Sequence, residues 1–399
     1  MNSKLETENI EVEENYDSSY EISNWDELEI DPNILRGIYS YGFEKPSPIQ
    51  CKSIKAILLK KDIIAQAQSG TGKTAAFTIG ALGLIDVKIK TTQILILSPT
   101  RELSLQTANV IKNIGNMMEG LVVQTLVGGS SIDESIDQLK KNTPHVIVGC
   151  PGRVFDMIRR EKIQSGNIKL VILDEADEML STGFKEQVYN IFHYFNNEIQ
   201  VALFSATLPN YIHNITNKFM RNPIKIFVKT EGLTLEGISQ YYVALEDDKQ
   251  KYLTLKDLYS VISLSQCIIY CNSVKRVSEL YEAMLQDEFP VCCIHSSMEK
   301  IERENAFAEF RNGKYRVLIS SNVTARGIDI QQVSCVINFD LPKCVHTYLH
   351  RIGRSGRWGR KGVGINFITR RDISKMKEIE QHYNSQINEL PSQFDNLMK

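Results

Sequence analysis

The chain has 399 residues, of which 42% are hydrophobic and 24% are charged, and its formal net charge is −2. This length accommodates two or three hydrophobic cores, and the hydrophobic fraction excludes a chain that is mostly disordered. The sequence contains no run of about 18 apolar residues and begins with an acidic segment, so we expect neither a membrane-spanning helix nor a secretion signal.

Charge is distributed unevenly along the chain. Residues 1–31 contain eleven acidic residues and one lysine, which leaves a net charge of about +8 on the remainder. A mild basic excess suits a polyanionic partner without proving one. Residues 1–20 are rich in Glu, Asn and Ser, and we expect them to form an acidic disordered tail.

The eight cysteines form no CxxC pair, and most of them lie in apolar segments. This pattern indicates reduced core thiols in a cytoplasmic protein or, as an alternative, a nuclear one. The cysteines are Cys51, Cys150, Cys267, Cys271, Cys292, Cys293, Cys335 and Cys344.

Short apolar runs alternate with longer amphipathic stretches along most of the chain. Near-continuous Val, Ile and Leu runs separated by helix-length segments are typical of parallel strands covered on both faces. The sequence therefore predicts an α/β fold with parallel sheets flanked by helices. The expected strands lie at 62–67, 93–99, 145–151, 169–175 and 200–206, and then at 266–272, 291–297, 315–321, 334–340 and 363–369.

The alternation is interrupted at residues 228–240, where two glycines and several polar residues occur. A short linker there divides the chain into two domains, residues 21–227 and 241–399. Both halves show the alternation, but no fixed period of about 20 to 50 residues repeats, so a solenoid is not expected.

The string AQSGTGKT follows the first expected strand and precedes an apolar helical stretch. This is the strand, loop and helix context of a phosphate-binding loop. We expect backbone N–H groups to face the phosphates of ATP, Lys73 to reach the β and γ phosphates, and the Thr74 hydroxyl to bind Mg²⁺. A glycine-rich turn is the alternative, and Ala67 stands where the usual pattern has its first glycine. The expected ATP-binding residues of the loop are Ala67, Gln68, Ser69, Gly70, Thr71, Gly72, Lys73 and Thr74.

The expected strand at 169–175 ends in carboxylates, in the string LVILDEAD. Asp174 can hold Mg²⁺ through its waters, and Glu175 can orient or deprotonate the water that attacks the phosphate. The alternative is that acidic residues lie in a first helical turn because the helix dipole favours them there. Together with the phosphate-binding loop, they favour a site with Lys73, Asp174 and Glu175 as catalytic residues.

With these motifs the chain resembles the DEAD-box RNA helicases, whose name-giving tetrapeptide is present at 174–177. The resemblance covers nearly the whole chain from Trp25 onwards, and it implies two tandem RecA-like domains with ATP and Mg²⁺ as cofactors. Residues 23–51 resemble the Q motif of the family, which implies that Gln50 reads the adenine edge and that Trp25 stacks on adenine. As isolated residues they would more often be a surface amide and a core anchor.

Several loops at expected strand ends resemble the RNA-facing motifs of the family. Hydroxyl, guanidinium and free backbone N–H groups suit contacts with the phosphodiester backbone and read no bases. Each short string alone is more simply a turn or a helix cap. By resemblance, the expected RNA-binding residues are Pro99, Thr100, Arg101, Gly128, Gly129, Gly152 and Arg153, with Asn272, Ser273, Arg303, Ser321 and Arg326 in the second domain.

Motifs that link ATP to RNA are also implied by the resemblance. The string SAT, with Ser205 and Thr207, resembles the motif that couples hydrolysis to strand separation. In the second domain, the strings ARGID and HRIGRSGRWGRKG would ordinarily be a solvated basic patch. By resemblance they supply the remaining residues: Arg354 and Arg357 reach the γ phosphate as catalytic residues, His350 and Arg351 pair with the first domain, and Asp329 touches the ribose.

The chain departs from the family pattern at four positions. Cys150 replaces a phosphate-binding threonine, Asn322 replaces an aspartate, Ser296 replaces a glycine, and Lys300 replaces a glutamine. All four lie on the expected RNA side or in the second domain. We therefore expect ordinary ATP binding and an altered RNA affinity or unwinding rate.

The strings ILRGIYSYGFEKPSPIQ, LTLEGI and DEADEML resemble the eukaryotic initiation factor 4A subfamily, which includes its exon-junction relative. The resemblance implies a monomeric ATP-dependent RNA helicase that binds single-stranded RNA and a scaffold protein of helical repeats, and that acts in translation initiation. One alternative is an ATP-locked RNA clamp of the exon-junction or ribosomal-RNA-processing type. Another is a DNA-directed or non-nucleic P-loop ATPase.

Overall fold

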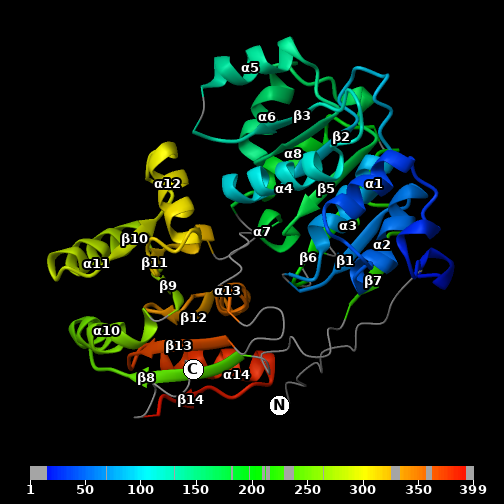
Figure 1. The fold of residues 1–399 in the computed structure, drawn as a ribbon. Helices are drawn as coiled ribbons and strands as arrows, with labels where there is room; N and C mark the ends of the chain where they lie inside the picture. Colours follow the sequence, from blue (N-terminus) through cyan, green and yellow to red (C-terminus); the bar gives the residue numbers. More distant parts are fainter. Residues whose placement is uncertain are drawn as a thin grey trace, which may run out of the picture. The chain divides into compact units, whose positions relative to one another are not determined.

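The computed structural model describes residues 16–68, 70–129, 131–180, 183–196, 198–208, 212, 216–228, 238–263, 265–324, 333–355 and 362–391. The chain divides into two compact units, Met1–Lys229 and Thr230–Lys399. Each unit has a seven-stranded parallel sheet with helices packed against it (Figure 1).

The sheet of the first unit has the strand order β3-β4-β2-β5-β6-β1-β7. Every residue of β2, β4, β5 and β6 is buried, as expected for parallel strands covered on both faces. Because all strands run in parallel, their carboxyl ends meet at one edge. The strands are β1 (Ile63–Gln66), β2 (Ile94–Leu97), β3 (Val123–Leu126), β4 (Val146–Gly149), β5 (Leu170–Asp174), β6 (Gln200–Ser205) and β7 (Ile224–Phe227).

Two hydrophobic cores lie on the two faces of this sheet. Ile63 and Ala65 belong to the core with helices α1 to α4, whereas Ile64 belongs to the core with α5 to α8. Local signals start the helices: the side chains of Thr100 and Ser131 cap α4 and α5. The helices are α1 (Pro32–Ser40), α2 (Pro48–Leu58), α3 (Lys73–Gly83), α4 (Arg101–Ile114), α5 (Ile132–Lys141), α6 (Pro151–Arg159), α7 (Ala176–Met179) and α8 (Lys185–Phe192), with 3₁₀ turns η1 (Ser18–Tyr20), η2 (Trp25–Glu27) and η3 (Ser165–Asn167).

The second unit repeats this topology. Its strand order is β10-β11-β9-β12-β13-β8-β14, which is the order of the first sheet when strands are numbered within each unit. The strands are β8 (Ile238–Ala244), β9 (Gln266–Tyr270), β10 (Val291–Ile294), β11 (Val317–Ser320), β12 (Val333–Asn338), β13 (Gly362–Ile368) and β14 (Asn388–Glu389).

Helices again cover both faces of the sheet. Ile268 belongs to the core formed with α12, α13 and α14, and Ile269 belongs to the core formed with α10 and α11. The helices are α10 (Asp248–Ile262), α11 (Val274–Gln286), α12 (Lys300–Arg311), α13 (Val345–Ile352) and α14 (Ile373–Tyr383), with the 3₁₀ turn η5 (Asn322–Thr324).

The predicted α/β fold is confirmed, and each expected apolar run contains a strand. Four further strands, β3, β7, β8 and β14, were not predicted. Three of them form edges of the sheets and the fourth pairs with β14, so their faces are less completely buried and their sequences mix polar with apolar residues. An apolar run therefore identifies strands whose residues are fully buried, including the edge strand β10, and misses strands that are only partly buried.

Two expected boundaries are wrong. Residues 238–240, assigned to the linker, begin β8 and pair with β13; residues 229–237 lie outside the described residues. Residues 16–20, assigned to the disordered tail, are ordered: they include η1, and Tyr16 and Tyr20 pack against the first core. Residues 1–15 lie outside the described residues.

Two simple expectations can be compared directly with the structure. All eight cysteines are free thiols, and five of them are buried. In the part of the chain that the structure describes, no helix combines the length and apolarity needed to cross a membrane.

Candidate nucleotide-binding and RNA-binding sites

The phosphate-binding loop lies between β1 and α3. Gly70 and Gly72 have φ values of 85° and 97°, a conformation that strains residues with a side chain. A Cβ atom on Gly72 would also lie 2.5 Å from Nε2 of Gln50. The Lys73 side chain is buried, and its Nζ donates to the Ala67 carbonyl at 2.8 Å. The ammonium group is therefore held against the loop that is expected to bind phosphate.

The Q-motif segment is bonded to this loop. Ser47 and Gln50 form a capping box at the start of α2, in which Gln50 Oε1 accepts from the Ser47 N–H at 2.7 Å. Ser47 Oγ donates to the Thr71 carbonyl at 2.7 Å, and Gln50 Nε2 donates to the Gly72 carbonyl at 3.2 Å. Gln50 keeps one amide hydrogen and one lone pair for a ligand, and its reading of adenine stays a prediction.

Trp25 does not match its predicted role. The side chain is fully buried in the first core, and its Nε1 donates to the Phe43 carbonyl at 3.1 Å. Neither face of the indole is exposed to a ligand. The predicted stacking on adenine is therefore wrong for this structure, and Trp25 is a core anchor, which was the alternative.

The end of β5 places three carboxylates, Asp174, Glu175 and Asp177, in positions that are at most 3% exposed. Burial and then the charge of Glu175 raise the pKa of Asp174 to about 7, while the charge of Lys73 opposes this shift. Oxygen ligands with excess negative charge are the environment that Mg²⁺ prefers. The site therefore fits the predicted metal, with Asp174 and the Thr74 hydroxyl as its expected protein ligands.

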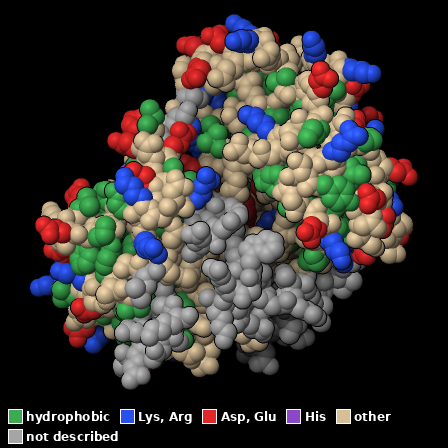
Figure 2. Space-filling model, in the orientation of Figure 1, with side chains coloured by type: hydrophobic (Ala, Val, Ile, Leu, Met, Phe, Trp, Pro, Cys, Tyr) green, Lys and Arg blue, Asp and Glu red, His purple; other side chains and the backbone are tan. Residues whose placement is uncertain are grey.

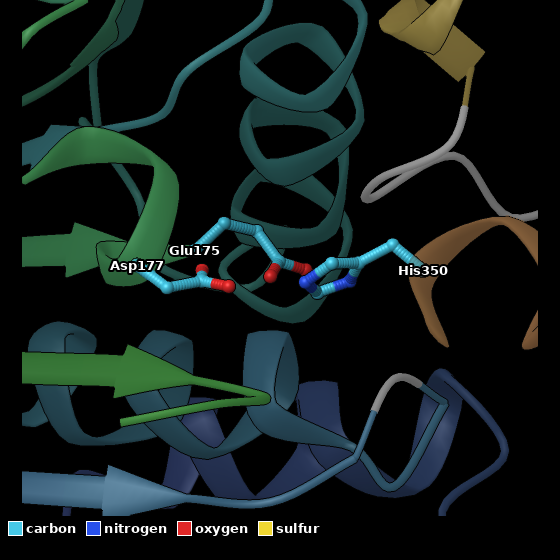
Figure 3. A group of neighbouring side chains, drawn as sticks. All are labelled: Glu175, Asp177 and His350. Carbon is cyan, nitrogen blue, oxygen red and sulfur yellow. The ribbon is translucent and has the colours of Figure 1, made fainter. Parts of the chain in front are cut away.

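Glu175 has a left-handed backbone, with φ of 52°, and such strain is frequent at functional sites. It turns the chain from β5 into α7, and Figure 3 shows Glu175 and Asp177 on this segment. Asp177 Oδ2 accepts from Thr207 Oγ1 at 2.8 Å, and Ser205 Oγ accepts from the Asp177 N–H at 3.3 Å. Both residues that are expected to couple hydrolysis to strand separation thus contact the carboxylate motif.

The predicted RNA-facing residues of the first unit lie at the carboxyl ends of β2, β3 and β4, next to the nucleotide residues after β1, β5 and β6. Arg101 is 8% exposed, and its Nη1 donates to the Gly128 carbonyl at 2.7 Å. Pro99 and Thr100 precede it, and Thr100 caps α4. Gly129 has φ of 85°. The structure thus brings the loops after β2 and β3 together, as RNA binding across them requires.

Cys150 follows β4, and Gly152 and Arg153 lie in the first turn of α6. Arg153 Nη1 donates to Ser135 Oγ at 2.8 Å, which joins the start of α6 to α5. Cys150 Sγ lies 3.7 Å from Ser104 Oγ, and burial raises the pKa of the thiol to about 11. A neutral thiol therefore stands where the family has a hydroxyl. Gly152 is exposed in the first turn of α6.

In the second unit, Asn272 and Ser273 follow β9. Ser273 Oγ accepts from the Arg276 N–H at 3.3 Å and caps α11. The Asn272 N–H donates to Asp340 Oδ2 at 3.0 Å, and Asn272 Nδ2 donates to the Leu341 carbonyl at 2.8 Å. These bonds fix the Asn272 side chain at the carboxyl end of the sheet, and its contact with RNA stays a prediction.

Arg351 is fully buried, and a guanidinium has five N–H groups. Nε and Nη2 donate to Asn322 Oδ1 at 2.9 and 2.7 Å, and Nη2 also donates to Asn272 Oδ1 at 2.8 Å. Nη1 donates to Asn338 Oδ1 at 3.0 Å and to the Asp340 carbonyl at 2.8 Å. All five groups are bound within the second unit, and the predicted pairing of Arg351 with the first domain stays a prediction.

The other predicted residues of the second unit keep their status as predictions. Arg354 and His350 are each 2% exposed, and Arg354 Nε donates to the His350 carbonyl at 3.3 Å; His350, labelled in Figure 3, comes from α13. Ser321 is 8% exposed after β11, and Arg303 lies on α12. Ser296 lies between β10 and α12. Ser69, Arg326, Asp329, Arg357 and the side chain of Lys300 lie outside the part of the structure that is described.

Sequence reasoning missed two kinds of supporting residue. Ser47 tethers the phosphate-binding loop, and the Ser-x-x-Gln spacing of a capping box could have identified it. Asp340 accepts from Arg276 Nε and Nη2, both at 2.7 Å. Its position at the end of the apolar run 334–340 parallels that of Asp174, and this was the available signal.

Charged side chains of both signs lie on the face that Figure 2 shows. In the view of Figure 2, Lys and Arg side chains are interspersed with Asp and Glu on the coloured surface. RNA contacts are therefore better assigned from the loops at the strand ends than from surface charge alone.

Family models match both units. Residues 47–215 match the model of the DEAD/DEAH box helicase, and residues 250–359 match that of the helicase conserved C-terminal domain. Among solved structures, Saccharomyces cerevisiae Dbp5 bound to RNA and ADP BeF3 aligns with a TM-score of 0.87 at 34% identity, over 94% of this chain and 98% of that one.

Curated relatives match along nearly their whole length. ATP-dependent RNA helicase eIF4A of Saccharomyces cerevisiae (strain YJM789) is 48% identical over 391 residues, which is 98% of each chain. ATP-dependent RNA helicase FAL1 of Eremothecium gossypii is 48% identical over 375 residues, which is 94% of each chain. Together with the buried carboxylates and the phosphate-binding loop, these matches show that the chain belongs to the DEAD-box RNA helicases of the eIF4A type.

Proposed function

We propose that this protein hydrolyses ATP when single-stranded RNA is bound, separates short RNA duplexes locally, and acts in translation initiation. The observation that carries the proposal is the contact of Thr207 and Ser205 with Asp177, beside the buried Asp174 and Glu175. This linkage joins the predicted hydrolytic residues to the predicted coupling residues within one unit. The relatives named eIF4A support initiation over the RNA-clamp alternative.

The ATP chemistry follows from the residues at the end of β5 and in the loop after β1. Lys73 offsets charge on the β and γ phosphates, and Glu175 orients or deprotonates the attacking water. When bound, Mg²⁺ neutralises phosphate charge, with Thr74 and Asp174 as its expected holders. Arg354, which the sequence assigns to the γ phosphate, adds charge stabilisation in the transition state.

RNA is bound by its backbone in this proposal. The loops after β2, β3 and β4 present hydroxyl, guanidinium and backbone N–H groups, which suit sugar and phosphate and select no base. RNA and ATP each favour the conformation that binds both, so each increases the affinity for the other. Gripping one strand in this way excludes its complement and opens a short duplex.

Partner and location follow from the resemblance to the initiation factor subfamily. We propose that a scaffold protein of helical repeats directs this monomeric helicase to its RNA in the cytoplasm. One related solved structure, Saccharomyces cerevisiae dbp5 bound to gle1, gives an example of a family member with a protein partner.

ATPase and strand-displacement assays test the proposal. ATP turnover should rise on addition of oligouridylate, and a short RNA duplex should separate only when ATP is present. Turnover that RNA fails to stimulate would instead support a P-loop ATPase with another substrate. A single turnover with slow product release and no displacement would support the RNA clamp.

A further inference from the structure

Asn322 lies at the carboxyl edge of the second sheet, directly after Ser321, and its side chain is exposed. Its Oδ1 accepts two hydrogen bonds from the buried Arg351, at 2.9 Å from Nε and 2.7 Å from Nη2. Asn322 therefore lies between the buried guanidinium of Arg351 and the surface of the protein.

These two bonds fix the orientation of the amide. Arginine has hydrogen-bond donors and no acceptor, so the oxygen of Asn322 must face Arg351 and the Nδ2 group must point away from it. Among the described residues, Asn322 Nδ2 donates no hydrogen bond. The result is an exposed N–H₂ group whose orientation is set from the interior.

The surroundings of this group carry a positive excess. Arg276 makes two bonds of 2.7 Å to the Asp340 carboxylate, Lys251 lies 3.7 Å from the same carboxylate, and Arg276 also pairs with Asp248 at 3.2 Å. Three cations thus share two carboxylates, and Arg351 is bound directly by neutral oxygens. Burial lowers the pKa of Arg351 to about 10, so it remains cationic at neutral pH.

We propose that Asn322 is an RNA-binding residue, whose Nδ2 group donates to a phosphodiester oxygen while Arg351 fixes the amide and supplies favourable positive potential. A phosphate oxygen is the expected ligand because the group is a donor beside a cluster in which cations outnumber carboxylates. This inference rests on the proposed path of RNA along the edge that includes Ser321. It makes Asn322 a positive determinant of RNA affinity rather than a neutral replacement of an acidic residue.

The test is RNA binding by the full chain with Asn322→Asp. The aspartate can accept the same two bonds from Arg351, but it removes the donor and cancels the charge excess. We expect affinity for fluorescent oligouridylate, measured by anisotropy with a non-hydrolysable ATP analogue, to fall about threefold to tenfold at about 50 mM salt. The loss should shrink at about 200 mM salt, since screening weakens the charge contribution. The melting temperature should be equal or higher, because charged acceptors strengthen the bonds to Arg351.

Asn312→Asp is the matched control, because Asn312 is exposed after α12 at the opposite edge of the sheet and should leave the affinity unchanged. Equal or tighter RNA binding by Asn322→Asp would overturn the inference. A loss that is independent of salt, or that accompanies a lower melting temperature, would also overturn it and leave Asn322 a packing role. Ser321→Ala distinguishes a failure of this inference from a failure of the proposed RNA path. If neither Ser321→Ala nor Asn322→Asp weakens RNA binding, the proposed path of RNA along this edge is wrong.

Discussion

The two sheets have the same strand order, but the end of β5 in the first collects carboxylates, whereas the end of the equivalent strand β12 in the second is surrounded by cations. The first edge has Asp174, Glu175 and Asp177 near Lys73, whereas the second has Lys251, Arg276 and Arg351 with Asp248 and Asp340. The fold fixes where strand ends meet, and the residues after the strands decide which ligand they attract. On one scaffold, the charged residues thus suit a metal and water site in one unit and a phosphate-binding site in the other, as we propose.

Burial acts on the two edges in opposite senses. It raises the pKa of Asp174 to about 7 and lowers that of Arg351 to about 10, since a low-dielectric interior disfavours whichever form is charged. Each edge is therefore a place where a ligand of the opposite charge relieves an existing cost. In the proposed function, Mg²⁺ is that ligand at the first edge, and an RNA phosphate is that ligand at the second.

Among substitutions at the acidic edge, we expect one at Glu175 to reduce ATP hydrolysis most. Glu175→Gln should lower the rate of RNA-stimulated ATP hydrolysis about 10³- to 10⁴-fold, because the amide cannot accept a proton from water. ATP binding, measured with a fluorescent analogue, should change little. Glu186→Gln, an exposed exchange on α8, is the control. A variant that kept more than a tenth of the wild-type rate would remove Glu175 from the chemistry.

The contribution of the second unit to ATP hydrolysis is tested at Arg354, whose proposed partner is the γ phosphate. Arg354→Ala should lower the rate of hydrolysis about 10³-fold, the low end for an arginine that stabilises transferred phosphate. Stopped-flow measurement of phosphate release would give this rate, and Arg311→Ala at the exposed end of α12 is the control. Normal turnover by the Arg354 variant would mean that the second unit contributes no charge to the reaction.

The link between hydrolysis and strand separation is tested at Thr207. Thr207→Val keeps the shape of the side chain but removes the donor to Asp177. Leaving this buried carboxylate short of a partner should cost about 1 to 3 kcal/mol in the stability of that segment. We expect RNA duplex displacement to fall about tenfold while ATP turnover falls less than threefold. Equal losses in both assays would show that Thr207 supports the site without coupling its two activities.

The raised pKa of Asp174 predicts a pH dependence of stability. Between about pH 4 and pH 7 the folded state holds a proton that the unfolded state has lost, so the contribution of this group to stability declines as the pH rises through that range. Asp174→Asn removes the titration and still accepts the Glu175 N–H bond. Its stability advantage over the wild type should grow by roughly 2 kcal/mol from about pH 5 to pH 8 in thermal unfolding without nucleotide. A constant difference across this range would show that Asp174 titrates normally.

The sequence was sufficient for the parts of the molecule that depend on local pattern. Apolar runs located the central strands, and the glycine spacing with the following lysine located the phosphate-binding loop. Strands β3, β7, β8 and β14 were not predicted, because their residues are only partly buried and their sequences lack a continuous apolar run. The role of Trp25 was wrong because spacing alone cannot show that both faces of a ring are covered.

The network around Arg351 shows a second limit. Its partners Asn272, Asn322 and Asn338 follow or end three different strands, and nothing in their local sequence joins them to α13. Only the parallel pairing of β9 with β11 and β12 places these strand ends together. A buried arginine that is satisfied by amides gives no sequence signal, because each amide alone would be interpreted as a turn or cap residue.

The smallest effect is expected at Cys150, where the first unit meets RNA. Its thiol is neutral, lies 3.7 Å from Ser104 Oγ, and is a weak hydrogen-bond donor compared with a hydroxyl. Cys150→Thr should therefore raise the affinity for oligouridylate about threefold, because the gain in binding free energy is only part of that of one hydrogen bond. Cys51→Thr on α2 is the control, and filter binding gives the affinities. Suppose that Cys150→Thr leaves the RNA affinity unchanged while Asn322→Asp lowers it. Of these two departures from the family pattern, only the one at the basic edge of the second sheet would then affect RNA binding, and the two edges would differ in function although their strand order is the same.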